Sequence, residues 1–174
     1  MFIILDEVLG IQEIKDKSVP ITIRKAVRAV VLKDNKILMV HTNRGDYKFP
    51  GGGVKKQESL EEALIREVAE ETGYIVKNRG TYIGKIIQRS INQFDLHGIF
   101  EMKSYYYYCE VRDIPQEQHL DKYEEDQEFT PVWITLDEVI AQNEIVLENK
   151  EDNINPWVYR ETLALKYIRE NVLK

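Results

Sequence analysis

The sequence predicts a single α/β (α+β) domain in which strands alternate with three helices. Three observations lead to this fold class. Runs of β-branched and aromatic residues alternate with stretches rich in Glu, Ala, Leu and Arg. Hydrophobic residues make up 43% and charged residues 31% of the 174 positions, which is typical of a globular chain. No repeat, low-complexity tract or linker divides the sequence, so we treat residues 1–174 as one domain.

The first half of the chain contains a hairpin and the clearest helix. Residues 1–21 form a mixed lead-in that could add an edge strand or a flap. A strand at 23–32, a polar turn and a second strand at 37–40 predict the hairpin. Residues 58–72 are rich in helix formers and Gly73 follows as a C-cap, so this segment is predicted to be helical.

The second half predicts further strands and two more helices. The β-prone segments are 75–88, 105–111 and 131–134. Between the first two, residues 90–103 are predicted to be a loop or an irregular hairpin tip. A capping-box pattern starts a helix at 135–138. The last helix is predicted at 156–173, with Asn155 as its N-cap and proline at its first position.

Composition and charge exclude several classes of protein. Lys and Arg number 24 against 30 Asp and Glu, a net charge of −6, which argues against a nucleic-acid polymer or an anionic membrane as partner. No apolar run approaches the roughly 18 residues that span a bilayer. The first residues lack the basic region of a signal peptide. A single cysteine, Cys109, cannot form an internal disulfide. We therefore expect a cytoplasmic protein.

The first predicted helix places carboxylates on the face that should be buried. On a helical wheel with about 100° per residue and Leu60 at 0°, Leu64 falls near 40° and Glu71 near 20°. Glu67 borders the same face, and Glu70 is three residues further on. Like charges at this spacing repel each other, and partial burial raises the cost unless a cation is present. Since all these ligands are oxygens, the pattern predicts a site for Mg²⁺, Mn²⁺ or Ca²⁺ rather than zinc.

Glycines are concentrated just before this helix. Three consecutive glycines, 51–53, let the backbone approach a ligand and direct N–H or C=O groups toward it. Glu58 and Arg66 are eight residues apart, about two helical turns. We interpret them as an ion pair that fixes the glycine loop against the helix. A glycine-rich turn followed by acids at i, i+3 and i+4 indicates a metal site that also binds phosphate.

This pattern resembles the Nudix box, G-x5-E-x7-R-E-U-x-E-E-x-G-U, in which U is a bulky apolar residue. All seven fixed positions are present between residues 52 and 74: Gly52, Glu58, Arg66, Glu67, Glu70, Glu71 and Gly73. Tyr74 replaces the usual aliphatic residue, and Lys55 and Gln57 stand where members often carry an acid and a glycine. The segments 49–52 and 132–138 look like the family's flanking elements.

The resemblance implies the Nudix fold, a mixed β-sheet sandwiched between helices, and hydrolysis of a nucleoside diphosphate linked to a group X. Glu67, Glu70 and Glu71 would bind Mg²⁺ or Mn²⁺, with the Gly51 carbonyl as a further ligand. The catalytic base would be Glu67, Glu70 or an acid from a later loop. The structural residues of the motif would be Gly52, Glu58, Arg66 and Gly73.

An acidic segment later in the chain could add a metal ligand. Residues 113–128 contain seven acids and one lysine, and most of the acids are expected to be solvated. Glu124, Glu125 and Glu128 precede the strand at 131–134, where the resemblance implies another metal carboxylate. We predict Glu125 for this role.

Residues outside the box should recognise the substrate. Arg24, Arg28 and Arg44 could bind phosphates, and Arg44 is nearest to the glycine loop in sequence. Tyr47 is one of several aromatic residues that could stack on a base. We predict Arg28, Arg44 and Tyr47 as substrate-binding residues.

Several functions stay open on the sequence alone. The leading hypothesis is a MutT-like nucleoside triphosphate pyrophosphohydrolase. The alternative is an ADP-ribose or dinucleoside-polyphosphate pyrophosphatase. A module that senses a nucleotide without cutting it would usually have lost box acids. An isomerase of isoprenoid diphosphates would need a catalytic cysteine, for which Cys109 gives little support. The expected partner is a small nucleotide, and a homodimer stays open.

Overall fold

The computed structural model describes residues 4–149 and 152–171 of the chain. Within this part, eight strands and four helices follow one another. In chain order they are β1 (Leu5–Gly10), β2 (Ile21–Val30), β3 (Leu32–Lys33), β4 (Lys36–His41), β5 (Tyr47–Lys48), α1 (Leu60–Thr72), β6 (Val76–Ile91), β7 (Ile99–Val111), α2 (Lys122–Asp126), β8 (Thr130–Ile134), α3 (Leu136–Glu148) and α4 (Val158–Asn171).

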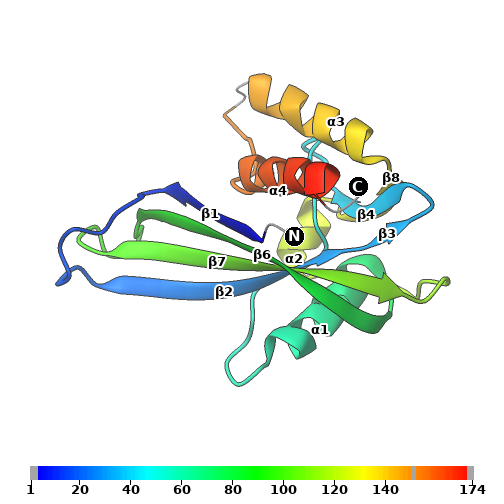
Figure 1. Ribbon diagram of the computed structural model, residues 1–174, viewed down its shortest axis with the longest axis horizontal. Coiled ribbons are helices and arrows are strands. Elements are labelled where there is room, and N and C mark those ends of the chain that lie inside the picture. The colour runs from blue at the N-terminus through cyan, green and yellow to red at the C-terminus, as the bar shows by residue number, and fades with distance from the viewer. Residues whose placement is uncertain (1–3, 150–151, 172–174) are drawn as a thin grey trace.

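The larger of two sheets is mixed and has the strand order β1-β6-β7-β2. β6 and β7 pair antiparallel, whereas β1 runs parallel to β6 and β2 runs parallel to β7. α1 covers one face of this sheet, and α3 and α4 lie on its other side (Figure 1). The predicted mixed sheet between helices is therefore confirmed. β1 supplies an edge strand within the lead-in, of which residues 1–3 lie outside the described residues.

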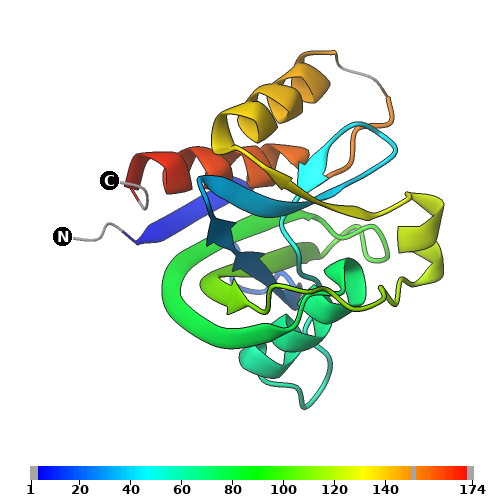
Figure 2. The same ribbon diagram turned by 90° about the vertical axis from the view of Figure 1, so that its right-hand side faces the viewer.

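The smaller sheet contains β3, β4 and β5, with β8 pairing along β4 in antiparallel register. Asp34 and Asn35 form the two-residue turn between β3 and β4, with φ of 50° and 60°. These residue types tolerate the left-handed region, so the predicted hairpin closes here. Figure 2 shows this sheet between the larger sheet and the pair α3 and α4.

α1 begins and ends where local signals place it. The Ser59 hydroxyl accepts the N–H of Glu62, and the Glu62 carboxylate accepts the N–H of Ser59, forming a capping box. Gly73 ends the helix in the left-handed conformation at φ 75°. Leu64 and Val68 are fully buried against the larger sheet. The helix therefore has a fixed rotation about its axis, which decides where its acids point.

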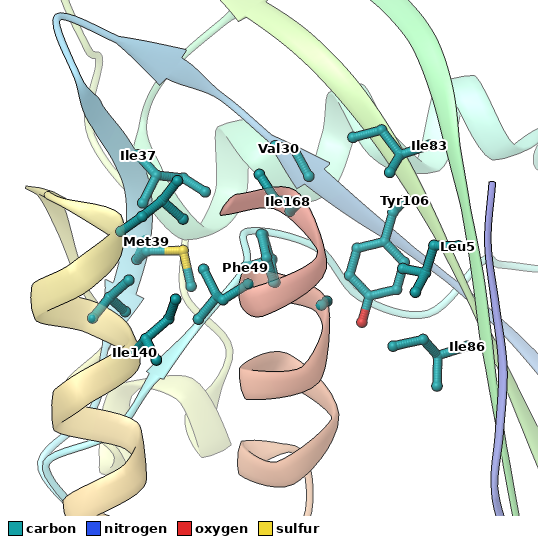
Figure 3. Close-up of a cluster of buried hydrophobic side chains, with 14 residues drawn as sticks. Leu5, Val30, Ile37, Met39, Phe49, Ile83, Ile86, Tyr106, Ile140 and Ile168 are labelled. Carbon is teal, nitrogen blue, oxygen red and sulfur yellow. The ribbon is translucent and has the colours of Figure 1, made fainter. Parts of the chain in front are cut away.

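Buried side chains pack on both faces of the larger sheet. Figure 3 shows the cluster between that sheet and α3 and α4, in which the rings of Phe49 and Tyr106 meet edge to face at 5.4 Å. A second cluster lies on the α1 side and includes Val27, Leu64 and Cys109. The two clusters hold α1 and α4 on opposite sides of the sheet.

β6 and β7 extend further than the sequence indicates. Instead of a loop over 90–103, β6 continues to Ile91 and β7 begins at Ile99. Across the ladder, Arg89 Nε lies 2.6 Å from Glu101 Oε2, and the Asn92 N–H donates to the Gly98 carbonyl. Polar residues can thus sit in strands when their cross-strand partners satisfy them.

Two differences lie in the carboxyl-terminal half. The acidic segment contains the short helix α2, capped by Asp121. α4 begins at Val158, and the Asn155 side chain donates to Asp46 and Gln127 instead of capping the helix. Residues 172 and 173 of the predicted helix lie outside the described residues. None of the described helices has both the length and the apolar character needed to cross a bilayer.

Candidate active site

The glycine loop is held against β2 by backbone hydrogen bonds. The N–H of Val27 donates to the Gly52 carbonyl at 3.0 Å, and the N–H of Ala29 donates to the Pro50 carbonyl at 2.8 Å. Gly51 has φ 147°, and a Cβ on it would stand 2.0 Å from the Val27 carbonyl oxygen. Position 51 therefore requires glycine, both for its backbone conformation and for its contact with β2.

Gly52 leaves room for a carboxylate of α1. A Cβ on Gly52 would stand 2.5 to 2.7 Å from the carboxylate atoms of Glu67. The Glu67 carboxylate thus occupies the space that a side chain at position 52 would fill. Glu67 itself is 8% exposed, so its carboxylate lies in the interior edge of the loop rather than in open solvent.

Three acids from two distant segments meet beside this loop. Carboxylate oxygens of Glu67, Glu71 and Glu124 all lie within 4.8 Å of one another. The wheel predicted the burial of Glu71, which is 2% exposed. The third acid is Glu124 on α2, whereas Glu125 is exposed and outside the cluster. The turn of α2 thus directs Glu124 toward α1, and not the predicted Glu125.

The pKa values of two of these acids are raised. Burial raises the pKa of Glu71 to about 7, although the ammonium of Lys48 and the N–H of Gly51 act in the opposite direction. Partial burial likewise raises the pKa of Glu124, and the nearby Glu67 adds to the shift. Carboxylates that are costly to ionise side by side are stabilised by a cation between them.

Arg66 links the glycine loop to α1. Its guanidinium donates to both oxygens of Glu58 at 2.7 and 2.9 Å, and to the Gly53 carbonyl at 3.1 Å. It also donates to Glu67 at 2.6 Å and to Glu70 at 3.1 Å. The predicted pair of Glu58 and Arg66 is thus present in the structure. Glu70 faces this arginine and does not join the three clustered acids.

The Gly51 carbonyl does not face a vacant ligand position. It accepts from Arg28 Nη1 at 2.9 Å and from Lys48 Nζ at 3.1 Å. Lys48 Nζ also lies 2.5 Å from Glu71 Oε1. The carbonyl that was expected as a metal ligand is therefore engaged by two cationic side chains.

A cleft of about 670 Å³ opens from this cluster, between the larger sheet and the segments α2 and α4. Register across the sheet places Leu9, Gln88, Met102 and Arg24 in one row on its floor. Further lining residues come from the glycine loop, from α1 and from α4. Acidic and basic side chains line the same cleft, so it offers donors for phosphate as well as ligands for a metal.

Two buried arginines of the cleft share one carboxylate. Arg28 on β2 and Arg160 on α4 are 6% and 4% exposed, and both line the cleft. Arg160 Nε donates to Glu161 Oε1 at 3.0 Å, while Arg28 Nε makes no hydrogen bond and lies 3.9 Å from the same oxygen. One carboxylate for two guanidinium groups leaves an excess of positive charge, which suits an anionic ligand.

Two predicted substrate residues lie away from the cleft. Arg44 Nη1 donates to Asn155 Oδ1 at 2.9 Å and to the Asn153 carbonyl at 3.1 Å. The Tyr47 ring packs against His41, with centroids 4.8 Å apart. Neither Arg44 nor Tyr47 lines the cleft, although both are close to the glycine loop in sequence. Arg28 does line it.

Lys48 and Arg160 are two charged cleft residues that sequence reasoning missed. Lys48 lies three positions before Gly51. The available signal was its place next to Phe49, because neighbouring side chains on an extended segment point to opposite faces. Arg160 lies on the last helix and carried no local signal, because only tertiary packing brings α4 over the cleft.

Cys109 lies on the α1 side, and burial raises the pKa of its thiol to about 12, so it is not a reactive thiolate.

The residues of the cluster fit a divalent cation. All their donor atoms are carboxylate oxygens, which suit Mg²⁺ or Mn²⁺. Because Gly52 has no side chain, the Glu67 carboxylate can lie against the glycine loop. Glu67 and Glu124 would hold such an ion, whereas both oxygens of Glu71 accept hydrogen bonds from Lys48 and the Gly51 N–H.

Comparisons with known proteins agree with this geometry. An ADP-ribose pyrophosphatase of Methanocaldococcus jannaschii is 45% identical over 56 residues, which are 30% of this chain and 33% of that protein. An 8-oxo-dGTP diphosphatase of Buchnera aphidicola (subsp. Acyrthosiphon pisum) is 52% identical over 42 residues, 21% of this chain and 34% of that protein. The matches span 33% to 48% of the lengths of the curated relatives.

A solved structure and a family model cover more of the chain. A NUDIX hydrolase from Nitrosomonas europaea shares the fold, with a TM-score of 0.58 and 20% identity over 88% of this chain and 97% of that one. The model of the NUDIX domain matches residues 22–158, well over half of the sequence. That range includes the glycine loop, α1 and α2, and the chain belongs to the NUDIX domain family.

Proposed function

We propose that this chain is a Mg²⁺-dependent hydrolase that cleaves a pyrophosphate bond in a nucleoside diphosphate linked to a group X. The observation that carries the proposal is the meeting of Glu67, Glu71 and Glu124 within 4.8 Å at one wall of the cleft. Arg28 and Arg160 line the same cleft. A phosphate chain needs both features, because its charge is neutralised by a metal on one side and by guanidinium groups on the other.

The side chains have separate roles in this proposal. A bound Mg²⁺ supplies charge neutralisation and lowers the pKa of a coordinated water. Glu67 and Glu124 would hold the ion, and the Glu67 carboxylate would accept the proton of the attacking water. Arg28 and Arg160 orient the phosphate oxygens. Arg66 contacts both Glu67 and Glu70, but only Glu67 lines the cleft, so Glu67 is favoured over Glu70 as the base.

The proposed substrate class is a nucleoside triphosphate, as in MutT-like pyrophosphohydrolases. The name of the Buchnera relative supports this choice, and the name of the Methanocaldococcus relative supports ADP-ribose as the alternative. The aromatic rings of Tyr123 and Trp157 line one end of the cleft and meet edge to face at 6.5 Å. They offer a surface for a nucleobase in either case.

The test is one chromatographic panel of products formed with Mg²⁺. It contains ordinary and oxidised nucleoside triphosphates, ADP-ribose, dinucleoside polyphosphates and nucleotide sugars. We expect a monophosphate plus pyrophosphate from a triphosphate, and no product after Mg²⁺ is removed with a chelator. AMP plus ribose phosphate would move the function to ADP-ribose hydrolysis. Binding without any cleavage would overturn the hydrolase and favour a nucleotide-sensing module.

A further inference from the structure

Lys48 holds a buried positive charge at the edge of the carboxylate cluster. Its side chain is 5% exposed, and Nζ lies 2.5 Å from Glu71 Oε1 and 3.1 Å from the Gly51 carbonyl oxygen. The ring of Phe129 lies 5.0 Å from Nζ. A buried ammonium needs such partners, since desolvation without them is costly. The contacts therefore fix the charge at this point of the cleft.

The Gly51 carbonyl oxygen accepts hydrogen bonds from two cationic side chains. A carbonyl oxygen has two lone pairs, and here Arg28 and Lys48 each donate to it. A divalent ion on the same oxygen would have to displace one of these groups and would be repelled by the other. Glu71 is engaged in the same way, because Oε1 faces Lys48 and Oε2 accepts the N–H of Gly51.

We infer that Lys48 takes the place of one divalent ion in the cleft; this inference rests on the function proposed above. The ammonium occupies the position between the Gly51 carbonyl and Glu71, and one ion is held between Glu67 and Glu124. Removing the ammonium would open Gly51 and Glu71 as a second metal position.

The experiment counts bound Mn²⁺ per chain from the loss of the free-Mn²⁺ EPR signal, without nucleotide. We expect one bound ion in the wild-type protein and two in Lys48→Met, which keeps the length of the side chain but not its charge. Lys48→Gln is the second neutral variant, in case Lys48→Met folds poorly. Thermal unfolding with and without Mn²⁺ is the second readout, and Mn²⁺ should raise the Tm of either variant more than that of the wild type.

The matched control is Lys56→Met, which removes the same charge from an exposed position of the loop. It should bind one Mn²⁺ like the wild type. Two bound ions in the wild type, or no additional ion in both Lys48 variants, would overturn the inference while leaving the hydrolase proposal standing. A wild-type chain that binds no Mn²⁺ and cleaves no substrate would overturn the proposed function as well.

Discussion

Glu71 is the most deeply buried acid of the cleft, and its neighbours decide its charge. Its carboxylate is 2% exposed, which by itself favours the neutral form. Lys48 at the end of β5 and the Gly51 N–H of the following loop favour the ionised form. A buried carboxylate is tolerated here because the segment 48–51 supplies both a cation and a donor.

Neighbouring acids on α2 should differ sharply in their effect on activity. Glu124→Gln removes a carboxylate of the cluster, and we expect kcat/KM with Mg²⁺ to fall by roughly 100-fold, because a metal ligand contributes several kcal/mol to the transition state. Glu125→Gln changes an exposed side chain outside the cluster and is the matched control. Its kcat/KM should stay within about twofold of the wild type on the same substrate. A loss in Glu125→Gln as large as in Glu124→Gln would contradict the assignment.

The residues that sequence predicts well are those fixed by local geometry. The burial of Glu71 follows from its angle on the helix relative to Leu64, and the end of α1 follows from Gly73. Glu124 could not be separated from Glu125 in the same way, because α2 has five residues and no apolar stripe to set its rotation. Arg44 is near the loop in sequence, but its hydrogen bonds to 153 and 155 turn it away from the cleft.

At the scale of elements, the join between the glycine loop and α1 should depend on Arg66. Its bidentate pair with Glu58 lowers the pKa of that carboxyl to about 2 from its ordinary 4.5. A lowered pKa means that the pair stabilises the folded state above pH 4.5 and that this stabilisation is lost as the pH falls toward 2. We expect Arg66→Met to lower the free energy of unfolding by about 2 kcal/mol at pH 7.

Urea unfolding of the wild type and of Arg66→Met at pH 7 and pH 3 checks this prediction. The difference between the two proteins should be smaller at pH 3, because the Glu58 carboxyl of the unfolded chain is then largely protonated while the folded pair is still mostly ionised. Lys122→Met is the control, because its pair with Asp126 is exposed and contributes at most about 0.5 kcal/mol. An Arg66→Met protein as stable as the wild type at pH 7 would refute a structural role for the pair.

Elements were predictable where their ends carry their own signals. Ser59, Glu62 and Gly73 mark both ends of α1, and the Thr135 capping box marks the start of α3. The ends of β6 and β7 were not predictable, because polar residues such as Arg89 find their partners only across the strand pair. The start of α4 was misplaced for a related reason: the Asn155 amide is used by Asp46 and Gln127, which are distant in sequence.

At the scale of the whole molecule, Glu161 connects α4 to both sheets. It is fully buried, its Oε2 accepts the N–H of Phe49 at 3.1 Å, and its Oε1 faces both Arg160 and Arg28. Sequence could not reveal this connection, because Arg28 and Phe49 are more than 100 positions from Glu161 along the chain. One carboxylate thus holds the last helix, the end of β5 and two arginines of the cleft together.

Neutralising this carboxylate should affect the fold and the cleft at the same time. Glu161→Gln leaves two buried guanidinium groups without a counter-charge, and we expect the free energy of unfolding to fall by about 3–5 kcal/mol. In a chain of this size that lowers the Tm by roughly 6–20 °C. Glu144→Gln is the control, since its partner Lys166 is also partly exposed and the pair contributes about 1 kcal/mol at most. Calorimetry of both variants checks the difference. Equal Tm values for Glu161→Gln and the wild type would mean that Arg28 and Arg160 are stabilised without Glu161. The idea that these two arginines share one carboxylate would then be refuted.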